Sequence, residues 1–429
     1  MTPHSKVPRA PYGDSTLAIM REGYDFIWNR CRRLETDIFV TRVMGRRAVC
    51  IHGREAAALF SDDYLFQRHG AVPRGVVTFL FGGHSTHTAD GPTKGNDESS
   101  FPSLTRPAEL ERLMDITSEE WRRSIRRWEK ERSVILFDEA QRLLTRAACT
   151  WVDLPLDDGE VGMRARDLGR LVDAFGETGP RLWRGRIARL RTEAWIARAI
   201  DRVRRGDLNP APGTALHVLA NTLDEKGELL PMRVVVAEML NLLRPTIAVA
   251  WYVTFAALAL YQRPLMRPKV AADRTFADLF MQEVRRYFPL TPFLGARVKE
   301  PFTWRGHRFT PGTLVLLDVH GNHHDPRLWQ APDEFRPERF ENWNGGEKQS
   351  KDKEEWVTMN QLSLALHFLT RCVTYDVDPK QNFSFDLSRM PTQPKSGFVL
   401  LDVRPKPDLE ESSPRLNVFT RPRVRSLAS

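Results

Sequence analysis

The sequence predicts a mainly α protein with a small β region. The longest apolar pattern with helical spacing covers residues 232–262, and a second amphipathic helical pattern covers residues 274–288. Residues 36–53 and 300–319 alternate instead with the period of paired strands, and a short β run is expected at 397–403. Because the strand patterns are few and short, helices are expected to supply most of the hydrophobic core.

A further helix is predicted at residues 184–205, where arginines alternate with apolar residues. The helical period places Ile187, Leu190, Ala194 and Ala197 together on one face, which is expected to point inward. The arginines then lie on a solvated face, which is the usual place for such a run.

The composition indicates one globular unit. Of 429 residues, 41% are hydrophobic and 28% are charged, and the net charge is +9. The positive excess is spread through helical segments and not concentrated in a stripe, so no nucleic-acid partner is expected. We expect a flexible N-terminus at residues 1–15, a single domain at 16–405 and a basic flexible tail at 406–429.

Cysteine usage and the apolar runs indicate a cytoplasmic protein. The four cysteines form no C-x-x-C pair, which argues against a disulfide or zinc framework. The first 14 residues contain no apolar core typical of a secretion signal. The longest apolar run, 247–261, is shorter than the roughly 20 residues of a membrane span. A buried central helix is therefore expected, and no membrane span.

Two charged motifs lie about fifty residues apart. Glu283 and Arg286 have E-x-x-R spacing in a predicted helix, and the segment DEFRPERF follows two predicted strands. A buried Glu283 needs ionic partners because an isolated charge is costly in a low dielectric. Arg286 together with Arg339 or Arg336 can supply them through bidentate hydrogen bonds. These residues are expected to have a structural role.

This order of motifs resembles the cytochrome P-450 superfamily. The segments NLLRPTIAVAWYVTFAALAL, EVRRYFPLTPFLGARV and VLLDVHGNHHDPRLW are similar to its fatty-acid peroxygenase branch, and the resemblance covers roughly residues 20–403. It implies a cytochrome P-450 fold, a haem cofactor and a long-chain fatty acid or other carboxylate as ligand. It also implies hydroxylation or decarboxylation with hydrogen peroxide, which needs no dedicated reductase.

The resemblance assigns two candidate catalytic residues. Most cytochromes P-450 have an acid–alcohol pair in the central helix, whereas this branch has Arg-Pro, which Arg244 and Pro245 match. By resemblance, Arg244 holds the substrate carboxylate through two parallel hydrogen bonds, and Pro245 belongs to the same substrate site. His87 falls where the branch has a residue facing the haem pocket. The alternative for His87 is an ordinary loop histidine, since His84 lies three residues away.

Two departures from the family concern its haem contacts. Where the family holds the propionates with a histidine and an Arg-Lys pair, this chain has about Lys94, Asp97 and Glu98, and the acids would repel propionates. The segment after Phe340, ENWNGGEKQSKDKEEW, has no cysteine in the place of the iron ligand. Cys372 corresponds to a position beyond the next helix, about 20 Å from the position of the iron ligand. It is expected to be a core residue.

No haem-binding or metal-ligating residue is therefore predicted. Residues 86–101 and 341–356 are poor in apolar residues and are expected to be loops. Either the sequence is an imperfect translation of its gene at both places, which the abrupt composition change favours, or the protein has lost haem. Two functions remain open: a peroxide-using fatty-acid hydroxylase or decarboxylase, and a haem-free protein that binds a carboxylate ligand on the same fold.

Overall fold

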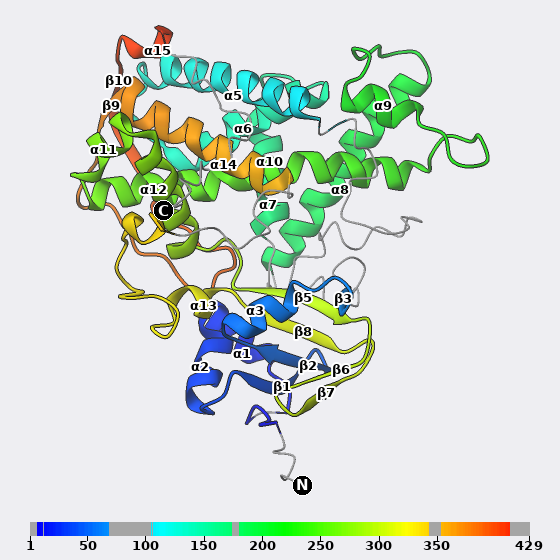
Figure 1. Ribbon diagram of the computed structural model, residues 1–429. Coiled ribbons are helices and arrows are strands. Elements are labelled where there is room, and N and C mark those ends of the chain that lie inside the picture. The colour runs from blue at the N-terminus through cyan, green and yellow to red at the C-terminus, as the bar shows by residue number, and fades with distance from the viewer. Residues whose placement is uncertain are drawn as a thin grey trace, which may run out of the picture.

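The structure is a computed structural model that describes residues 7–11, 13–67, 104, 106–173, 180–342 and 353–411. Figure 1 shows a helical part and, below it, a smaller part built around a sheet. The prediction of a mainly α protein with a small β region is confirmed. Strands are found in all three of the predicted β regions.

The helices of the described residues are α1 (Thr16–Glu22), α2 (Phe26–Arg33), α3 (Arg54–Phe60), α5 (Pro107–Trp128), α6 (Leu136–Val152), α7 (Val161–Asp173), α8 (Pro180–Arg204), α9 (Ala215–Asn221), α10 (Met232–Gln262), α11 (Met266–Ala272), α12 (Arg274–Tyr287), α13 (His320–His324), α14 (Lys353–His367) and α15 (Asp408–Glu411). Shorter helical turns are η1 (Gly23–Asp25), η4 (Pro337–Phe340) and η5 (Phe368–Cys372).

The strands are β1 (Ile38–Val43), β2 (Arg46–Ile51), β3 (Phe66–Gln67), β4 (Ser133–Ile135), β5 (Phe293–Val298), β6 (Phe302–Trp304), β7 (His307–Phe309), β8 (Leu314–Asp318), β9 (Val373–Asp376) and β10 (Val399–Pro405). The main sheet has the order β1-β2-β8-β5-β3, with β2 and β8 parallel and the other pairs antiparallel. Smaller sheets are β4-β10-β9 and β6-β7.

The main sheet is buried on both faces. Along β8, Leu314 and Leu316 pack in a cluster with residues of α1 and α2, whereas Val315 and Leu317 pack in a second cluster with α3. This follows from the two-residue period of a strand, which sends successive side chains to opposite faces. The chain before α1 also joins this part, because the backbone N–H of Ala10 donates to the carbonyl of Val40.

The central helix α10 extends through the helical part, as predicted for residues 232–262. Its N-terminal half packs in one hydrophobic cluster and its C-terminal half, from Val249 to Leu260, packs in another. By length and composition α10 alone among the described residues could cross a membrane, but 72% of its apolar window is buried inside the protein. It is therefore a core helix.

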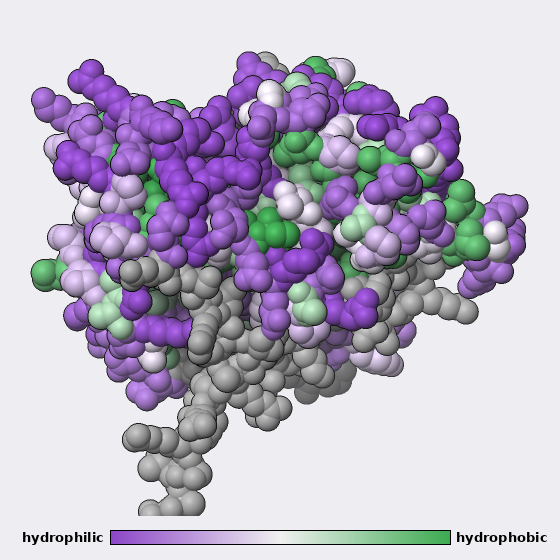
Figure 2. All heavy atoms as spheres, turned by 90° about the horizontal axis from the view of Figure 1, so that it is seen from above, coloured by the Kyte–Doolittle hydropathy of each residue, from purple (hydrophilic) through white to green (hydrophobic). Residues whose placement is uncertain are grey.

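The prediction that Ile187 and Leu190 lie on the inward face of α8 is wrong. Ile187 and Leu190 are 49% and 67% exposed, whereas Trp195, Ile196 and Ile200 are buried. The helix turns the face with the large indole ring against α7 and α9, because burying Trp195 removes more apolar surface from water. Viewed from above, the molecule presents mainly hydrophilic side chains, with apolar ones in separate small groups (Figure 2).

Candidate functional site

Glu283 lies at the centre of a buried ion cluster. The α12 helix that carries it begins at Asp273, whose carboxylate accepts a hydrogen bond from the Thr275 N–H. Glu283 is fully buried. Arg286 donates to both of its carboxylate oxygens, from Nε at 2.7 Å and from Nη2 at 2.9 Å, and Arg339 Nε lies 3.2 Å away. The ion pairs predicted from the sequence are present.

The arginines of this cluster also hold the chain that follows α13. Arg286 donates to the carbonyls of His323 and Glu334, and Arg339 donates to those of Gln330, Ala331 and Glu334. The backbone N–H of Arg336 donates to Glu283 Oε1 at 2.7 Å. We call Glu283, Arg286, Arg339 and the Arg336 N–H the Glu283 cluster. These contacts tie α12 to the chain between α13 and η4.

Arg244 and Pro245 lie in the middle of α10, and both are half-buried. The helix continues through Pro245 although proline removes one backbone donor. The neighbouring side chains Leu243 and Ile247 are fully buried, so this turn of α10 borders the hydrophobic core. Arg244 is not part of the Glu283 cluster. His87 lies outside the described residues, as do Lys94, Asp97 and Glu98.

The cysteines do not fit a haem-thiolate site. All four are buried and without disulfides, and none lies between η4 and α14, where the iron ligand of the family belongs. Burial raises the pKa of Cys149 to about 12 and also raises the pKa of Cys31 and Cys50, so these thiols stay protonated.

Cys372 is fully buried in the hydrophobic cluster that also contains residues of α12 and α14, as predicted for a core residue. Its sulfur lies 3.5 Å from His367 Nε2. Among the described residues, no group of three or more histidine, cysteine, aspartate or glutamate side chains is arranged to hold a metal ion. The predicted loop 86–101 lies outside the described residues, as do residues 343–352 of the predicted loop 341–356. The loop prediction is wrong at residues 353–356, which form the first turn of α14.

A second buried ionic group was not predicted from the sequence. His52 follows β2, and its Nδ1 lies 2.9 Å from Asp318 and its Nε2 3.0 Å from Asp325. All three side chains are buried. Because carboxylates only accept hydrogen bonds, the positions of Asp318 and Asp325 on the two ring nitrogens favour the imidazolium form of His52. Burial alone lowers the pKa of His52, but the hydrogen bonds and charges of Asp318 and Asp325 together raise it above 6.5.

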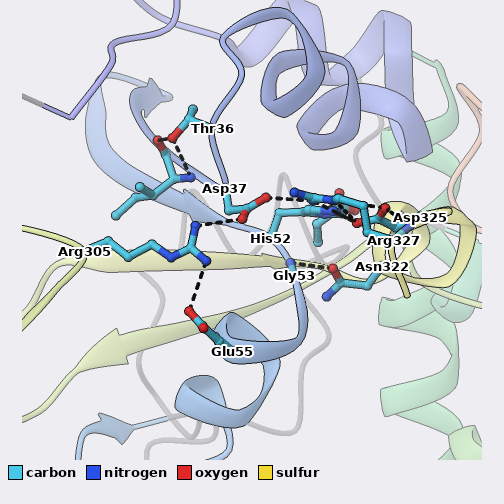
Figure 3. Close-up of polar contacts among 11 residues, drawn as sticks. Thr36, Asp37, His52, Gly53, Glu55, Arg305, Asn322, Asp325 and Arg327 are labelled. Carbon is cyan, nitrogen blue, oxygen red and sulfur yellow. Dashed lines mark hydrogen bonds and ion pairs between the residues drawn. The ribbon is translucent and has the colours of Figure 1, made fainter. Parts of the chain in front are cut away.

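Arginines extend this ionic group toward the surface (Figure 3). Arg327 donates to both oxygens of Asp325 and to Asp37, and Arg305 bridges Asp37 and Glu55. The group therefore joins the β1–β2 hairpin and α3 to the chain after α13. The only signal in the sequence was the pair of aspartates around HGNHH, and nothing there indicates that His52, 266 residues before Asp318, is their partner.

Comparisons with known proteins point to one family. A family model described as Cytochrome P450 matches residues 268–358. Cytochrome P450 3A15 of Cavia porcellus is 35% identical over 75 residues, which are 18% of this chain and only 15% of that protein.

Similarity to solved structures extends over nearly the whole chain. The structure of cytochrome P450EX alpha (CYP152N1) with myristic acid has a TM-score of 0.83 and 36% identity, and the match covers 94% of this chain and 100% of that one. A variant of cytochrome P450 OleT in complex with arachidonic acid has a TM-score of 0.85 and 31% identity, with 94% and 99% covered.

Proposed function

This chain belongs to the cytochrome P450 family, in its CYP152 branch, and on that premise we propose that it binds a long-chain fatty acid by the carboxylate without a thiolate-bound haem. The observation that carries the proposal is the half-buried pair Arg244-Pro245 in the middle of α10. It is supported by two structural neighbours, P450EX alpha with myristic acid and a P450 OleT variant with arachidonic acid.

The chemistry of Arg244 suits a carboxylate. Its planar guanidinium can donate two parallel hydrogen bonds to the two oxygens, and it keeps its charge at any physiological pH. Beside the buried Leu243 and Ile247, such a charge-assisted pair is stronger than it would be in water. The alkyl chain of the ligand would gain from contact with the apolar core that surrounds α10.

Haem takes no part in this proposal. A cytochrome P450 uses a cysteine thiolate as iron ligand, and the four cysteines of this chain are buried elsewhere. The expected function is therefore binding of a carboxylate ligand in the cytoplasm, with no reductase and no nucleic acid as partner.

A second candidate function is the hydrogen-peroxide-dependent hydroxylation or decarboxylation of a fatty acid. The complete Glu283 cluster favours it, because by family resemblance this cluster lies behind the haem loop. In this function Arg244 anchors the substrate carboxylate and His87 is the second catalytic residue. It requires an iron ligand that none of the four cysteine positions supplies.

The test is a thermal unfolding titration with myristic acid. A ligand specific to the folded state must raise the melting temperature, so the wild-type chain is expected to show a rise that saturates. Arg244→Ala should remove most of this rise, and Arg244→Lys should keep part, since an ammonium group lacks the planar fork. Arg233→Ala, at an exposed arginine of the same helix, is the matched control. Equal rises for wild type and Arg244→Ala would contradict the proposal.

A further inference from the structure

The N-terminal half of α8 carries an exposed row of apolar side chains. Trp183 is 62% exposed, Ile187 49% and Leu190 67%, and Ala194 is also exposed. Residues separated by three or four positions lie above one another on a helix, so these four side chains form one continuous face. We call Trp183, Ile187, Leu190 and Ala194 the α8 stripe.

The opposite face of α8 already packs in the protein. Trp195, Ile196 and Ile200 are buried, and the helix contacts α7, α9 and α10. One apolar face is enough to attach a surface helix to its core. The α8 stripe is therefore additional to the face that holds α8 in the fold, and a group of exposed apolar side chains with a polar rim marks an interaction surface.

Arginines lie along both edges of the α8 stripe. At about 100° per residue, Arg186 is on one edge and Arg184 and Arg198 are on the other. These three arginines are exposed and form no ion pair with another described residue. Residues 183–198 contain five arginines and one glutamate. Of the other two arginines, one pairs with that glutamate and one with an aspartate of α7, so the edges of the stripe are positively charged.

Two side chains of this surface contact each other. The guanidinium carbon of Arg186 lies 5.4 Å from the centre of the Trp183 ring. An indole combines an apolar body with a polar N–H, and an arginine can lay its stem on apolar surface while its charged head stays in water. Both side chains therefore suit a boundary between water and hydrocarbon.

The charge of this surface distinguishes between its possible occupants. In a two-fold dimer through α8, the same arginines of both copies would face each other and repel. A lipid surface with anionic headgroups attracts them instead, and a basic helix with exposed tryptophan and leucine is typical of helices that lie in such a surface.

We propose that α8 docks on the surface of an anionic lipid bilayer. The α8 stripe enters the boundary between headgroups and acyl chains, and the arginines at its edges bind lipid phosphates. The contact is peripheral, because the opposite face of α8 stays in the protein core.

The experiment measures how much of the full chain sediments with lipid vesicles in the absence of fatty acid. Vesicles of phosphatidylcholine mixed with phosphatidylglycerol supply the anionic surface, and vesicles of phosphatidylcholine alone are the neutral comparison. The affinity is expected to be at least about tenfold higher for the anionic vesicles, since each arginine near an anionic surface contributes about fivefold. This difference should shrink as added salt screens the charges.

Variants of exposed residues separate the apolar and charged contributions. The double variant Trp183→Ser/Leu190→Ser should weaken binding to anionic vesicles at least about tenfold, because it removes two apolar side chains from the lipid. Arg186→Gln and Arg198→Gln should each weaken it about fivefold. The matched control is Leu265→Ser, at a leucine before α11 that is 82% exposed, and it should leave the affinity unchanged.

Arg244→Ala should also leave vesicle binding unchanged, so this inference and the fatty-acid proposal hold or fail separately. The melting temperature of each variant shows whether it is folded, and if the double variant does not fold, the two arginine variants still decide. The basic tail predicted at 406–429 is present in every variant, so binding through that tail would survive all of them.

Three results would overturn the inference. The first is binding to anionic vesicles that survives the changes in α8. The second is equal affinity for anionic and neutral vesicles. The third is self-association of the wild-type chain, measured by analytical ultracentrifugation, with no binding to vesicles.

Discussion

Two consecutive stretches of the chain differ sharply in how much of the family pattern they retain. From α12 to η4, the Glu283 cluster is complete, with every carboxylate oxygen of Glu283 in a hydrogen bond. The sequence immediately after η4 contains no cysteine where the family has its iron ligand. The support for a haem loop is thus present in a chain that lacks the ligand the loop would carry.

This difference concerns two separate features, the packing of the chain around Glu283 and the iron ligand of the family. The Glu283 cluster stabilises the chain after α13 through backbone carbonyls of residues 323–334. A buried carboxylate without its arginines would be strongly destabilising, so we expect the stability of the folded chain to depend on the cluster. Residues of α10, α12 and α14 pack in one hydrophobic cluster in this chain, which has no cysteine between η4 and α14.

The largest effect is expected from Glu283→Ala. It leaves the guanidiniums of Arg286 and Arg339 buried without their carboxylate, which costs about 3–5 kcal/mol of unfolding free energy. Urea denaturation followed by circular dichroism measures this loss. The matched control is Glu338→Ala in the adjacent η4, at an exposed glutamate, with an expected change within about 0.5 kcal/mol. Similar losses for both variants would mean that the Glu283 cluster is not a support.

The second-largest effect is expected from acid, which should lower the unfolding free energy through His323. Burial, followed by the charge of Arg286, lowers the pKa of His323 from 6.5 to about 3. The folded state therefore binds fewer protons than the unfolded chain between these values, so stability is full above pH 6.5 and falls as the pH falls toward 3. His323→Gln should reduce this loss by on the order of 2–4 kcal/mol. Identical pH profiles of unfolding free energy for the two proteins would contradict the assignment.

The His52 group should respond to pH in the opposite direction. Because Asp318 and Asp325 raise the pKa of His52, its stabilising contribution is full below pH 6.5 and is lost as the pH rises through the folded-state pKa. Unfolding free energies measured above pH 7 should therefore fall more steeply for wild type than for His52→Gln. A steeper fall for the variant would show that His52 is not held as an imidazolium.

The smallest effect on the unfolding free energy without ligand is expected from Arg244→Ala. Without ligand, Arg244→Ala should cost less unfolding free energy than Glu283→Ala, since the guanidinium is only half-buried. With saturating myristic acid, the variant should lack the stabilisation that a charge-assisted hydrogen bond provides, about 1.5–3 kcal/mol. Denaturation with and without the fatty acid separates the two quantities. If Arg244→Ala lost the same unfolding free energy with and without the fatty acid, Arg244 would have a structural role.

The parts that could be predicted from the sequence depend on local pattern and on order along the chain. The length of α10 follows from apolar spacing, and the partners of Glu283 follow from the order of motifs. The inward face of α8 could not be fixed, because small and apolar residues lie on several faces and only packing against α7 and α9 selects Trp195. The partners of His52 also depend on contacts between distant segments.

The most direct measurement is the absorption spectrum of the purified chain, incubated with haem, reduced and exposed to carbon monoxide. A cysteine thiolate on the iron gives the shifted Soret band typical of cytochromes P450. With no cysteine between η4 and α14, the chain is expected to show no such band while myristic acid still raises its melting temperature. A strong shifted Soret band would contradict the account, because it would show that this chain holds haem through a thiolate.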